Sequence, residues 1–177
     1  MGLPDPARTA LAAYLDTLAA WSPRVNLTAA RTPGERVRLL VAAVLPALPL
    51  VRTGRLVDVG SGNGSPGLVL ALTREDVHAT LLEPRAKRWA FLREAVRAAG
   101  AESRVDAVRA RHDGYDGPPA DTLTLRALAL PLRSLAPLVV PGGRLLVFGA
   151  VPAPDAAFGA EPAIASLPGL HVFRRSA

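Results

Sequence analysis

Apolar residues recur every three or four positions in the first part of the chain. Leu11, Leu15 and Leu18 fall on one side of a helix over residues 4–21. We expect Asp5 to cap this helix, because short polar side chains accept the first free backbone N–H groups. The pattern therefore predicts an amphipathic helix that packs one face on a core.

A second helix is predicted from a capping box. Thr32-Pro33-Gly34-Glu35 has the T-x-x-E spacing with Pro at the first helical position, and the helix is expected to run to about Leu45. Pro46 and Pro49 then close the helical front segment, since proline cannot continue a helix.

From Arg55 onward, short apolar runs alternate with helical segments. One helix is expected from Pro84 to Ala99, where Gly100 stops it. The last turn, Pro168-Gly169, precedes a closing antiparallel hairpin strand at 171–174. The buried strands are predicted at Leu56–Val59, Ala79–Leu82, Val105–Val108, Thr122–Leu125 and Leu145–Phe148.

This alternation is typical of an α/β fold with a parallel sheet and helices on both faces. We expect a Rossmann-like sheet with a terminal antiparallel hairpin, preceded by two N-terminal helices. The 177 residues fit a single domain, with a helical extension over 1–54 and a Rossmann-like core over 55–177.

Composition excludes several classes of function. The chain has no cysteine, which excludes disulfides and thiolate metal sites, and its three histidines are too scattered for a metal site. No apolar run reaches the ~18 residues of a membrane span, and the first residues lack the stages of a signal peptide. We expect a cytoplasmic protein, monomeric, without metal and without a membrane.

The net charge is +6 and is concentrated in one stretch. Between Pro84 and Arg111 there are eight basic residues and three acids, an excess of five positive charges. Such a surface attracts phosphate backbones, although a solvated face of arginines is an equally good interpretation of charge alone.

The most informative segment is the glycine loop after the first strand, Asp58-Val59-Gly60-Ser61-Gly62-Asn63-Gly64-Ser65-Pro66-Gly67. A strand that ends in closely spaced glycines and leads into a helix lets the backbone approach a ligand where a Cβ would collide. A tight turn without a ligand is the plain structural alternative.

Two functional interpretations of this loop meet the same obstacle. Residues 62–67 match the dinucleotide pattern G-x-G-x-x-G, but Pro66 removes a backbone N–H and Asp58 would repel pyrophosphate. A hydrolase nucleophile at Ser65, with His171 as a partner, needs the N–H of the next residue for its oxyanion hole. Pro66 has none.

The third interpretation is S-adenosylmethionine, which carries a sulfonium and an ammonium but no phosphate. In enzymes of that class an acid at the end of the first strand precedes G-x-G-x-G, as Asp58, Gly60, Gly62 and Gly64 do here. Glu83, at the end of the next strand, is placed to accept the ribose hydroxyls. The pattern thus predicts a class I S-adenosylmethionine-dependent methyltransferase.

Further motifs narrow the family. Trp21, Asn26-Leu27-Thr28-Ala29, the glycine loop, Lys87-Arg88, Phe91-Leu92 and Arg126-Ala127 together make residues 10–148 resemble the bacterial small-subunit ribosomal RNA guanine-N7 methyltransferases, the RsmG or GidB family. Family members usually carry a Lys-Gly after the fifth strand, where this chain has Phe148-Gly149.

The resemblance implies a cofactor, a substrate and a set of site residues. The cofactor would be S-adenosyl-L-methionine, and the substrate a guanine of 16S ribosomal RNA or of the small ribosomal subunit. Arg126 would lie at the methyl-transfer site, unless it only pairs with an acid such as Asp121. The implied cofactor contacts are Asp58, Gly60, Gly62, Gly64, Ser65, Glu83, His112 and Asp113, and the implied substrate contacts are Asn26, Lys87, Arg88 and Arg126.

Two other functions remain open at this point. The chain can be a degenerate family member that binds cofactor or RNA without this activity. It can also be a methyltransferase with another substrate.

Overall fold

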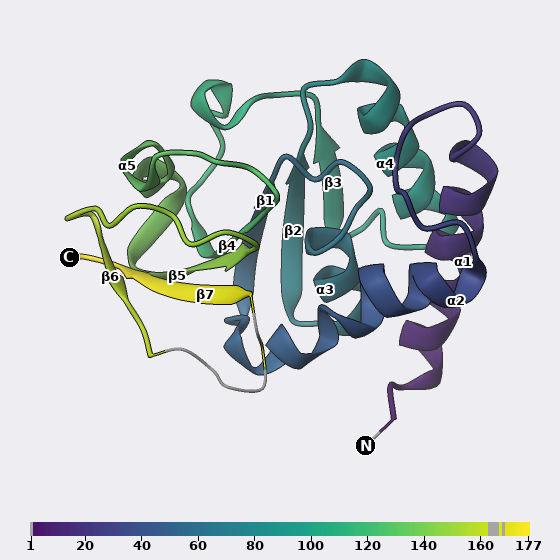
Figure 1. Ribbon diagram of the computed structural model, residues 1–177, viewed down its shortest axis with the longest axis horizontal. Coiled ribbons are helices and arrows are strands. Elements are labelled where there is room, and N and C mark those ends of the chain that lie inside the picture. The colour runs from purple at the N-terminus through teal and green to yellow at the C-terminus, as the bar shows by residue number, and fades with distance from the viewer. Residues whose placement is uncertain (1, 163–166, 168) are drawn as a thin grey trace.

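The computed structural model describes residues 2–162, 167 and 169–177. The chain forms one seven-stranded sheet in the order β3-β2-β1-β4-β5-β7-β6 (Figure 1). The strands are β1 (Gly54–Val59), β2 (Val77–Leu82), β3 (Val105–Val108), β4 (Ala120–Arg126), β5 (Val139–Phe148), β6 (Phe158–Ala160) and β7 (Leu170–Arg175). The first five strands are parallel, and β7 runs antiparallel to both β5 and β6.

The predicted strands are all present, and the Rossmann-like architecture is confirmed. Two details differ. β6 was not predicted, because its three residues carry too short a pattern to stand out. β5 also begins earlier than the predicted Leu145, because Pro141-Gly142-Gly143 lies inside the strand at a point where the pairing register with β4 shifts. Of the predicted Pro168-Gly169 turn, residue 168 lies outside the described residues.

The helical front segment begins with α1 (Asp5–Trp21), as predicted. Its N-cap is Pro4, so the expectation for Asp5 was wrong. Asp5 is the first helical residue and pairs with Arg8 one turn later instead of accepting backbone N–H groups.

The second helix is interrupted. The Thr32 capping box is present and starts α2 (Pro33–Arg36), but the chain continues as a π-helix, η1 (Val37–Ala42), and then as a 3-10 helix, η2 (Leu45–Leu50). The expectation of one α-helix to Leu45 was therefore wrong. π-helical turns are rare and concentrate at functional sites.

One face of the sheet carries most of the helical cover (Figure 1). α1, α3 (Gly67–Thr73) and α4 (Ala86–Ala98) contribute to a core with β1, β2 and β3, and buried residues of η1 and η2 join it. Tyr14, Leu18 and Phe91 are among its fully buried side chains. The helical extension over 1–54 therefore shares one core with the sheet.

The opposite face is covered only in part. Short elements, η3 (His112–Gly114), α5 (Leu132–Leu135) and η4 (Ala136–Leu138), follow β3 and β4, and the second core gathers beneath α5 and η4. Over β2 and β3 this face carries His78 and Asp106, both exposed. Helices thus lie on both faces, but not over the whole second face. Among the described residues no helix is long and apolar enough to cross a membrane.

Candidate active site

The candidate site lies where the strand order changes direction. β1 has β2 on one side and β4 on the other, so the chain segments that leave these strands diverge at their carboxyl ends. Ligands of open α/β sheets bind at such switch points. The glycine loop follows β1, Glu83 follows β2, and Arg126 ends β4.

The glycine loop has a backbone that other residues rarely adopt. Gly60, Gly62 and Gly64 have φ of 69°, 51° and 90°, in the left-handed region. A Cβ on Gly60 would lie 2.3 Å from Leu128 Cδ1, so the side chain of Leu128 covers this glycine. A Cβ on Gly62 would meet no atom nearer than 3.6 Å, so conformation alone requires glycine there within the chain.

Asp58 is buried beneath the loop, with 1% exposure. Its Oδ1 accepts a hydrogen bond from Thr124 Oγ1 at 2.5 Å, and in the described part of the chain Oδ2 has no hydrogen-bond partner. A Cβ on Gly67 would lie 2.3 Å from Asp58 Cβ, so α3 starts against this side chain. Burial raises the pKa of the Asp58 carboxyl to about 6.

Glu83 binds the backbone of the loop. Its Oε2 accepts from the Gly62 N–H at 3.0 Å and its Oε1 from the Arg85 N–H at 2.9 Å, with 3% exposure. The carboxylate therefore links the loop after β1 to the loop after β2. Each oxygen retains further lone pairs, because one carboxylate has about four acceptor sites.

The N-terminal segment holds the other side of the loop. Tyr14 Oη donates to the Asn63 carbonyl at 2.8 Å, and Asn63 Nδ2 donates to the Leu27 carbonyl at 3.1 Å. Burial raises the pKa of Tyr14 above its ordinary range, so the phenol remains a neutral donor. The Asn-Leu-Thr segment and the glycine loop are thus in direct contact.

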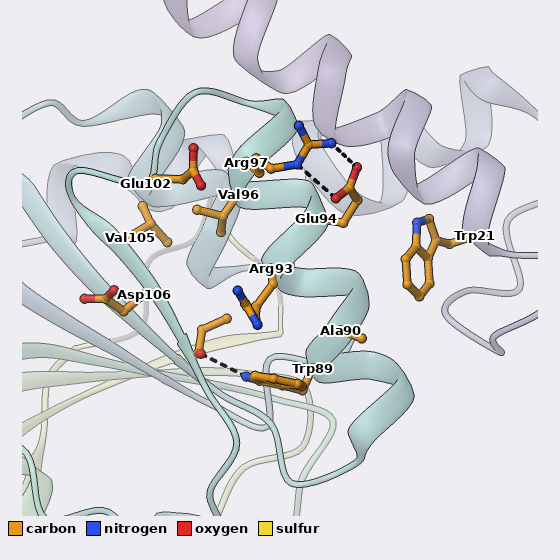
Figure 2. Close-up of a pocket in the computed structure, with 11 residues that line it drawn as sticks. Trp21, Trp89, Ala90, Arg93, Glu94, Val96, Arg97, Glu102, Val105 and Asp106 are labelled. Carbon is orange, nitrogen blue, oxygen red and sulfur yellow. Dashed lines mark hydrogen bonds and ion pairs between the residues drawn. The ribbon is translucent and has the colours of Figure 1, made fainter.

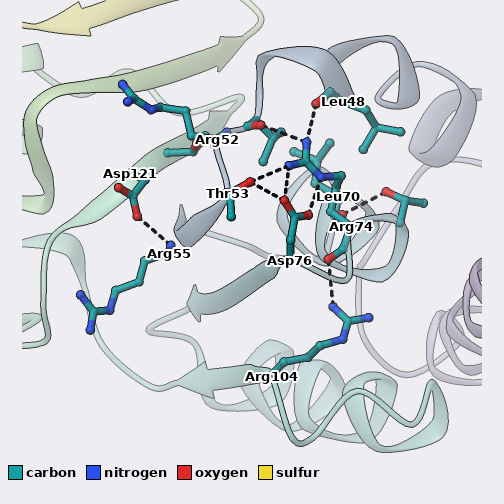
Figure 3. A network of polar contacts seen from close by, with 12 residues as sticks. Leu48, Arg52, Thr53, Arg55, Leu70, Arg74, Asp76, Arg104 and Asp121 are labelled. Carbon is teal, nitrogen blue, oxygen red and sulfur yellow. Dashed lines mark hydrogen bonds and ion pairs between the residues drawn. The ribbon is translucent and has the colours of Figure 1, made fainter.

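Arg126 also belongs to this scaffold. Its Nη1 donates to Ser65 Oγ at 2.7 Å and its Nη2 to the Leu39 carbonyl at 3.0 Å, while Ser65 Oγ donates to the Leu40 carbonyl at 2.8 Å. These bonds tie the π-helix η1 to the glycine loop. The alternative pairing of Arg126 with Asp121 was wrong: Asp121 lies near the start of β4, where it accepts from the Arg55 N–H (Figure 3).

The expected substrate contacts lie beside the carboxyl ends of the parallel strands, where the glycine loop also lies. Arg88 Nη2 donates to the Asn26 carbonyl at 2.9 Å, so these two are brought together, with the Asn26 residue exposed. Lys87 is exposed on the first turn of α4. His112 and Asp113 lie on η3, where Arg111 pairs with Asp113 at 3.2 Å. Within the described residues no hydrogen bond or ion pair joins these two to the glycine loop.

The basic stretch does not form one surface. Arg85, Lys87, Arg109 and Arg111 are exposed on the segments that leave β2 and β3 at their carboxyl ends. Arg104 lies before β3, where its Nη1 donates to the Ala71 and Arg74 carbonyls (Figure 3). The interpretation of the whole stretch as one RNA face was therefore too broad.

A groove along α4 and β3 lies away from the glycine loop (Figure 2). Trp89 Nε1 donates to the Ala107 carbonyl at 2.9 Å, and the Arg93 guanidinium lies 5.2 Å from the Trp89 ring centre. The lining also includes the carboxylates Glu94, Glu102 and Asp106. Its two arginines do not outnumber these acids, so the groove does not extend the basic surface.

Two cavities adjoin the ends of β4 and β5. One, of about 570 Å³, lies between η1 and these strand ends and includes Arg126. The other, of about 650 Å³, lies between residues 127–131 and residues 147–153. Both include Ala127 and Phe148. Ala127 has φ of 54°, a strained backbone for a residue with a Cβ.

The chain matches the GidB family, described as rRNA small subunit methyltransferase G, over residues 7–151. It belongs to this family. The resemblance noted over residues 10–148 is thereby confirmed.

Relatives in the family share a large part of the sequence. Ribosomal RNA small subunit methyltransferase G of Xanthomonas campestris pv. campestris strain B100 is 41% identical over 135 residues, which cover 75% of this chain and 61% of the relative. The Salinispora tropica protein of that name is 46% identical over 123 residues, which cover 63% of this chain and 50% of that protein. The chain thus spans about three fifths of the length of the Xanthomonas relative and half of the Salinispora one.

Solved structures resemble the fold at low sequence identity. A mutant of MtNAS in complex with S-adenosylmethionine has a TM-score of 0.66 and 17% identity, covering 96% of this chain and 73% of that one. StiE O-MT has a TM-score of 0.54 and 20% identity, and the match covers 66% of this chain and 47% of that one. These similarities support the fold.

For this GidB family member, sequence reasoning missed three residues of the site. Tyr14 looked like one more position of the apolar face of α1, and only its hydroxyl marks it as a polar anchor. Thr124 alternates with apolar residues on β4, which hides its bond to Asp58. Leu128 follows Arg126-Ala127 and carried no polar signal, yet it covers Gly60.

Proposed function

We propose that this chain is an S-adenosylmethionine-dependent methyltransferase that methylates N7 of a guanine in small-subunit (16S) ribosomal RNA. The supporting observation is the glycine loop at the switch point, whose Gly62 N–H is bonded to Glu83 at 3.0 Å in a chain of the GidB family. Membership of the family supports the ribosomal RNA substrate.

The residues at the loop fit a nucleoside cofactor with cationic groups. Asp58 and Glu83 place two buried carboxylates close to the loop, which favours a sulfonium and an ammonium and disfavours a pyrophosphate. Each Glu83 oxygen accepts one backbone bond and has lone pairs left for a ribose hydroxyl. Asp58 Oδ2, which has no hydrogen-bond partner among the described residues, lies against Gly67 at the start of α3, so this carboxylate acts on the site through its charge.

The other expected cofactor residues take more specific roles in this proposal. Gly60 and Gly64 hold the loop in a left-handed backbone with Leu128 packed over the first and Tyr14 over the second, so in this proposal both contact the ligand through their main chain. The Ser65 hydroxyl is engaged with Arg126 and Leu40, so we assign Ser65 a contact through its main chain. His112 and Asp113 would border the adenine.

The transfer asks for alignment more than for acid or base catalysis. When bound, the cofactor supplies an electrophilic methyl group on a sulfonium. The N7 lone pair of guanine would take up this methyl group, with the electron pair of the C–S bond left on sulfur, so no side chain of the protein has to accept or donate a proton. The chain must therefore hold the loop and the acceptor in line and exclude water. Arg126, through Ser65, fixes the loop for that purpose.

Calorimetric titration tests the cofactor assignment. The purified protein should bind S-adenosylmethionine or its demethylated product, and it should not bind NAD. Glu83→Gln should weaken this binding at least tenfold, because the carboxylate contacts both loop and ribose. Glu102→Gln, an exposed position on another loop, serves as the matched control. Saturable NAD binding with no response to the methyl donor would overturn the assignment.

Two assays test the substrate. Single-turnover methylation of small ribosomal subunits should yield 7-methylguanine in 16S RNA, and mass spectrometry should find one guanine unmodified in a strain that lacks the gene. Cofactor binding without transfer would support the degenerate-member alternative. Transfer to another molecule would support a different substrate.

The remaining proposals concern the partner of the protein, its location, metal ions and its oligomeric state. In this proposal ribosomal RNA is the partner of the chain, and we expect the chain in the cytoplasm. The reaction needs no metal, and the described residues contain no cluster of three or more potential metal ligands. The expectation of a monomer stays a prediction, which sedimentation analysis can test.

A further inference from the structure

The larger of the two cavities at the strand ends has an unusual lining. Its eleven lining residues are all Ala, Val, Leu, Pro or Phe, and its volume is about 650 Å³. Leu128 and Val151 belong to it with 41% and 67% exposure, high values for large apolar side chains. We call it the apolar seat, residues 127–131, 147–148 and 150–153. Exposed apolar surface of this kind marks a binding site.

The apolar seat adjoins the glycine loop directly. Leu128 lines the seat and also covers Gly60, where its Cδ1 occupies the position that a Cβ would need. The seat opens where β4 and β5 end, beside Arg126, which is the register partner of Phe148. A group bound there would be separated from the loop by one side chain.

We propose that the apolar seat holds the acceptor of the methyl group, a planar heterocyclic base lifted out of a single-stranded RNA loop. The inference rests on the proposed function and specifies how that site chooses its substrate. Phe148, the aromatic residue of the seat, supplies the surface against which such a base stacks. The apolar walls exclude water from the reacting atoms.

The absence of polar side chains from this lining selects the kind of nucleophile. A hydroxyl or amine acceptor has to lose a proton and needs a base within hydrogen-bond reach. Among the described residues, no titratable side chain lines the seat. A ring nitrogen with a free lone pair needs none, so the seat suits an N7 acceptor. The polar edge of the base is then met by main-chain groups or water.

Filling the apolar seat tests this inference. Ala129→Trp introduces a bulky side chain into the wall, and Ala12→Trp makes the same change at an exposed position of α1. In single-turnover methylation of small subunits, the Ala129 variant should lose at least tenfold in kcat/KM while its cofactor affinity stays within twofold. The Ala12 variant should match the parent in both measurements.

A second variant guards against misfolding of the first. Phe148→Leu keeps an apolar side chain but removes the stacking surface, so KM for RNA should rise roughly five- to hundredfold with unchanged cofactor binding. The parent's kcat should also show no ionisation between about pH 7 and pH 9.

The outcomes separate this inference from the proposed function. An active parent with equally active Ala129 and Phe148 variants would overturn the seat and leave the function intact. A basic ionisation in kcat would overturn the choice of nucleophile. A parent that transfers no methyl to any small-subunit preparation would defeat the proposed function and the seat together.

Discussion

Arg126 donates a hydrogen bond to Ser65 Oγ at 2.7 Å, which joins the end of β4 to the glycine loop that follows β1. The same guanidinium reaches the Leu39 carbonyl of the π-helix η1 at 3.0 Å. The carbonyls of a π-helix need outside partners where the regular pattern fails, and here Arg126 and Ser65 supply them for Leu39 and Leu40. One arginine thus fixes the relative position of two segments that border the site.

Arg126→Ala should therefore lower turnover by disturbing the loop. We expect kcat to fall at least tenfold and the cofactor affinity to weaken. The protein should also lose about 1–3 kcal/mol of stability, because the hydrogen bonds of a charged guanidinium are removed. Arg126→Lys should recover part of the stability. It should not restore both hydrogen bonds, to Ser65 and to Leu39, because an ammonium lacks the forked geometry of a guanidinium. The measurement is single-turnover methylation per folded molecule, together with thermal unfolding.

A purely structural role of Arg126 has a different signature. In that case the variant would melt at a lower temperature but methylate at the parent's rate per folded molecule. Cofactor affinity would also be unchanged. Either observation would contradict the positioning role.

The stability of the protein should depend on the ionisation of Asp58. Its pKa is raised from 3.8 to about 6 by burial, so the folded state binds the proton more tightly than the unfolded state. Stability from this group is complete below about pH 4 and is lost as pH rises through 6, by at most about 3 kcal/mol. The Thr124 bond and the Arg126 charge oppose the effect.

Chemical denaturation from pH 4 to pH 8 measures this contribution. Asp58→Asn should remove it, so the stability of the parent relative to the variant should fall across the range. The comparison cancels carboxylates with lowered pKa, such as Asp76 and Glu94, whose contributions have the opposite sign. A difference that stays constant with pH would show that Asp58 does not titrate there.

Much of this fold follows from local patterns in the sequence. The strands were predicted because each is a short, largely apolar segment bounded by turn residues, and α1 because its leucines recur at helical spacing. β6 and the π-helix escaped prediction for a physical reason. Three residues carry no period, and the π-helix depends on donors from Arg126 and Ser65 that are far away in the chain.

The candidate site was predictable in its types of residue but not in their contacts. Glycines with an acid before them indicated the loop, yet nothing in the sequence shows that Glu83 binds Gly62 or that Tyr14 binds Asn63. The apolar seat could not be predicted at all. Its residues come from the apolar segment after β4 and from the end of β5 with the apolar segment that follows, and only the sheet register brings Arg126 and Phe148 together.

Two glycines of the loop should respond differently to substitution. The Cβ added by Gly62→Ala would meet no chain atom nearer than 3.6 Å, and the left-handed backbone would cost the variant about 1–2 kcal/mol of stability. This variant should therefore fold but bind the cofactor more weakly. Gly62→Val should abolish that binding. Gly67→Ala should instead destabilise the protein by several kcal/mol, because its Cβ would lie 2.3 Å from Asp58 Cβ.

Circular dichroism with calorimetric titration distinguishes these effects. Undiminished cofactor affinity in a folded Gly62 variant would place the ligand elsewhere. A stable Gly67→Ala protein would show that α3 does not start against Asp58 as described.

The last prediction concerns how the chain holds RNA. Only part of the basic stretch faces the site edge, namely Arg85, Lys87, Arg109 and Arg111, so only these should contact phosphates. Each phosphate neutralised on a single strand contributes about −0.7 to the slope of log affinity against log salt.

Lys87→Gln and Arg109→Gln should therefore each make the slope less steep by about that amount. Arg55→Gln is the matched control, because Arg55 is exposed near the start of β1, at the opposite end of the parallel strands from the glycine loop (Figure 3). Arg126→Ala should leave the slope nearly unchanged, since its guanidinium is committed to Ser65 and Leu39. Filter binding of small-subunit RNA at several salt concentrations gives all four slopes. An equal change in the Arg55 variant would mean that RNA is attracted by net charge alone and has no preferred track along the carboxyl ends of β2 and β3.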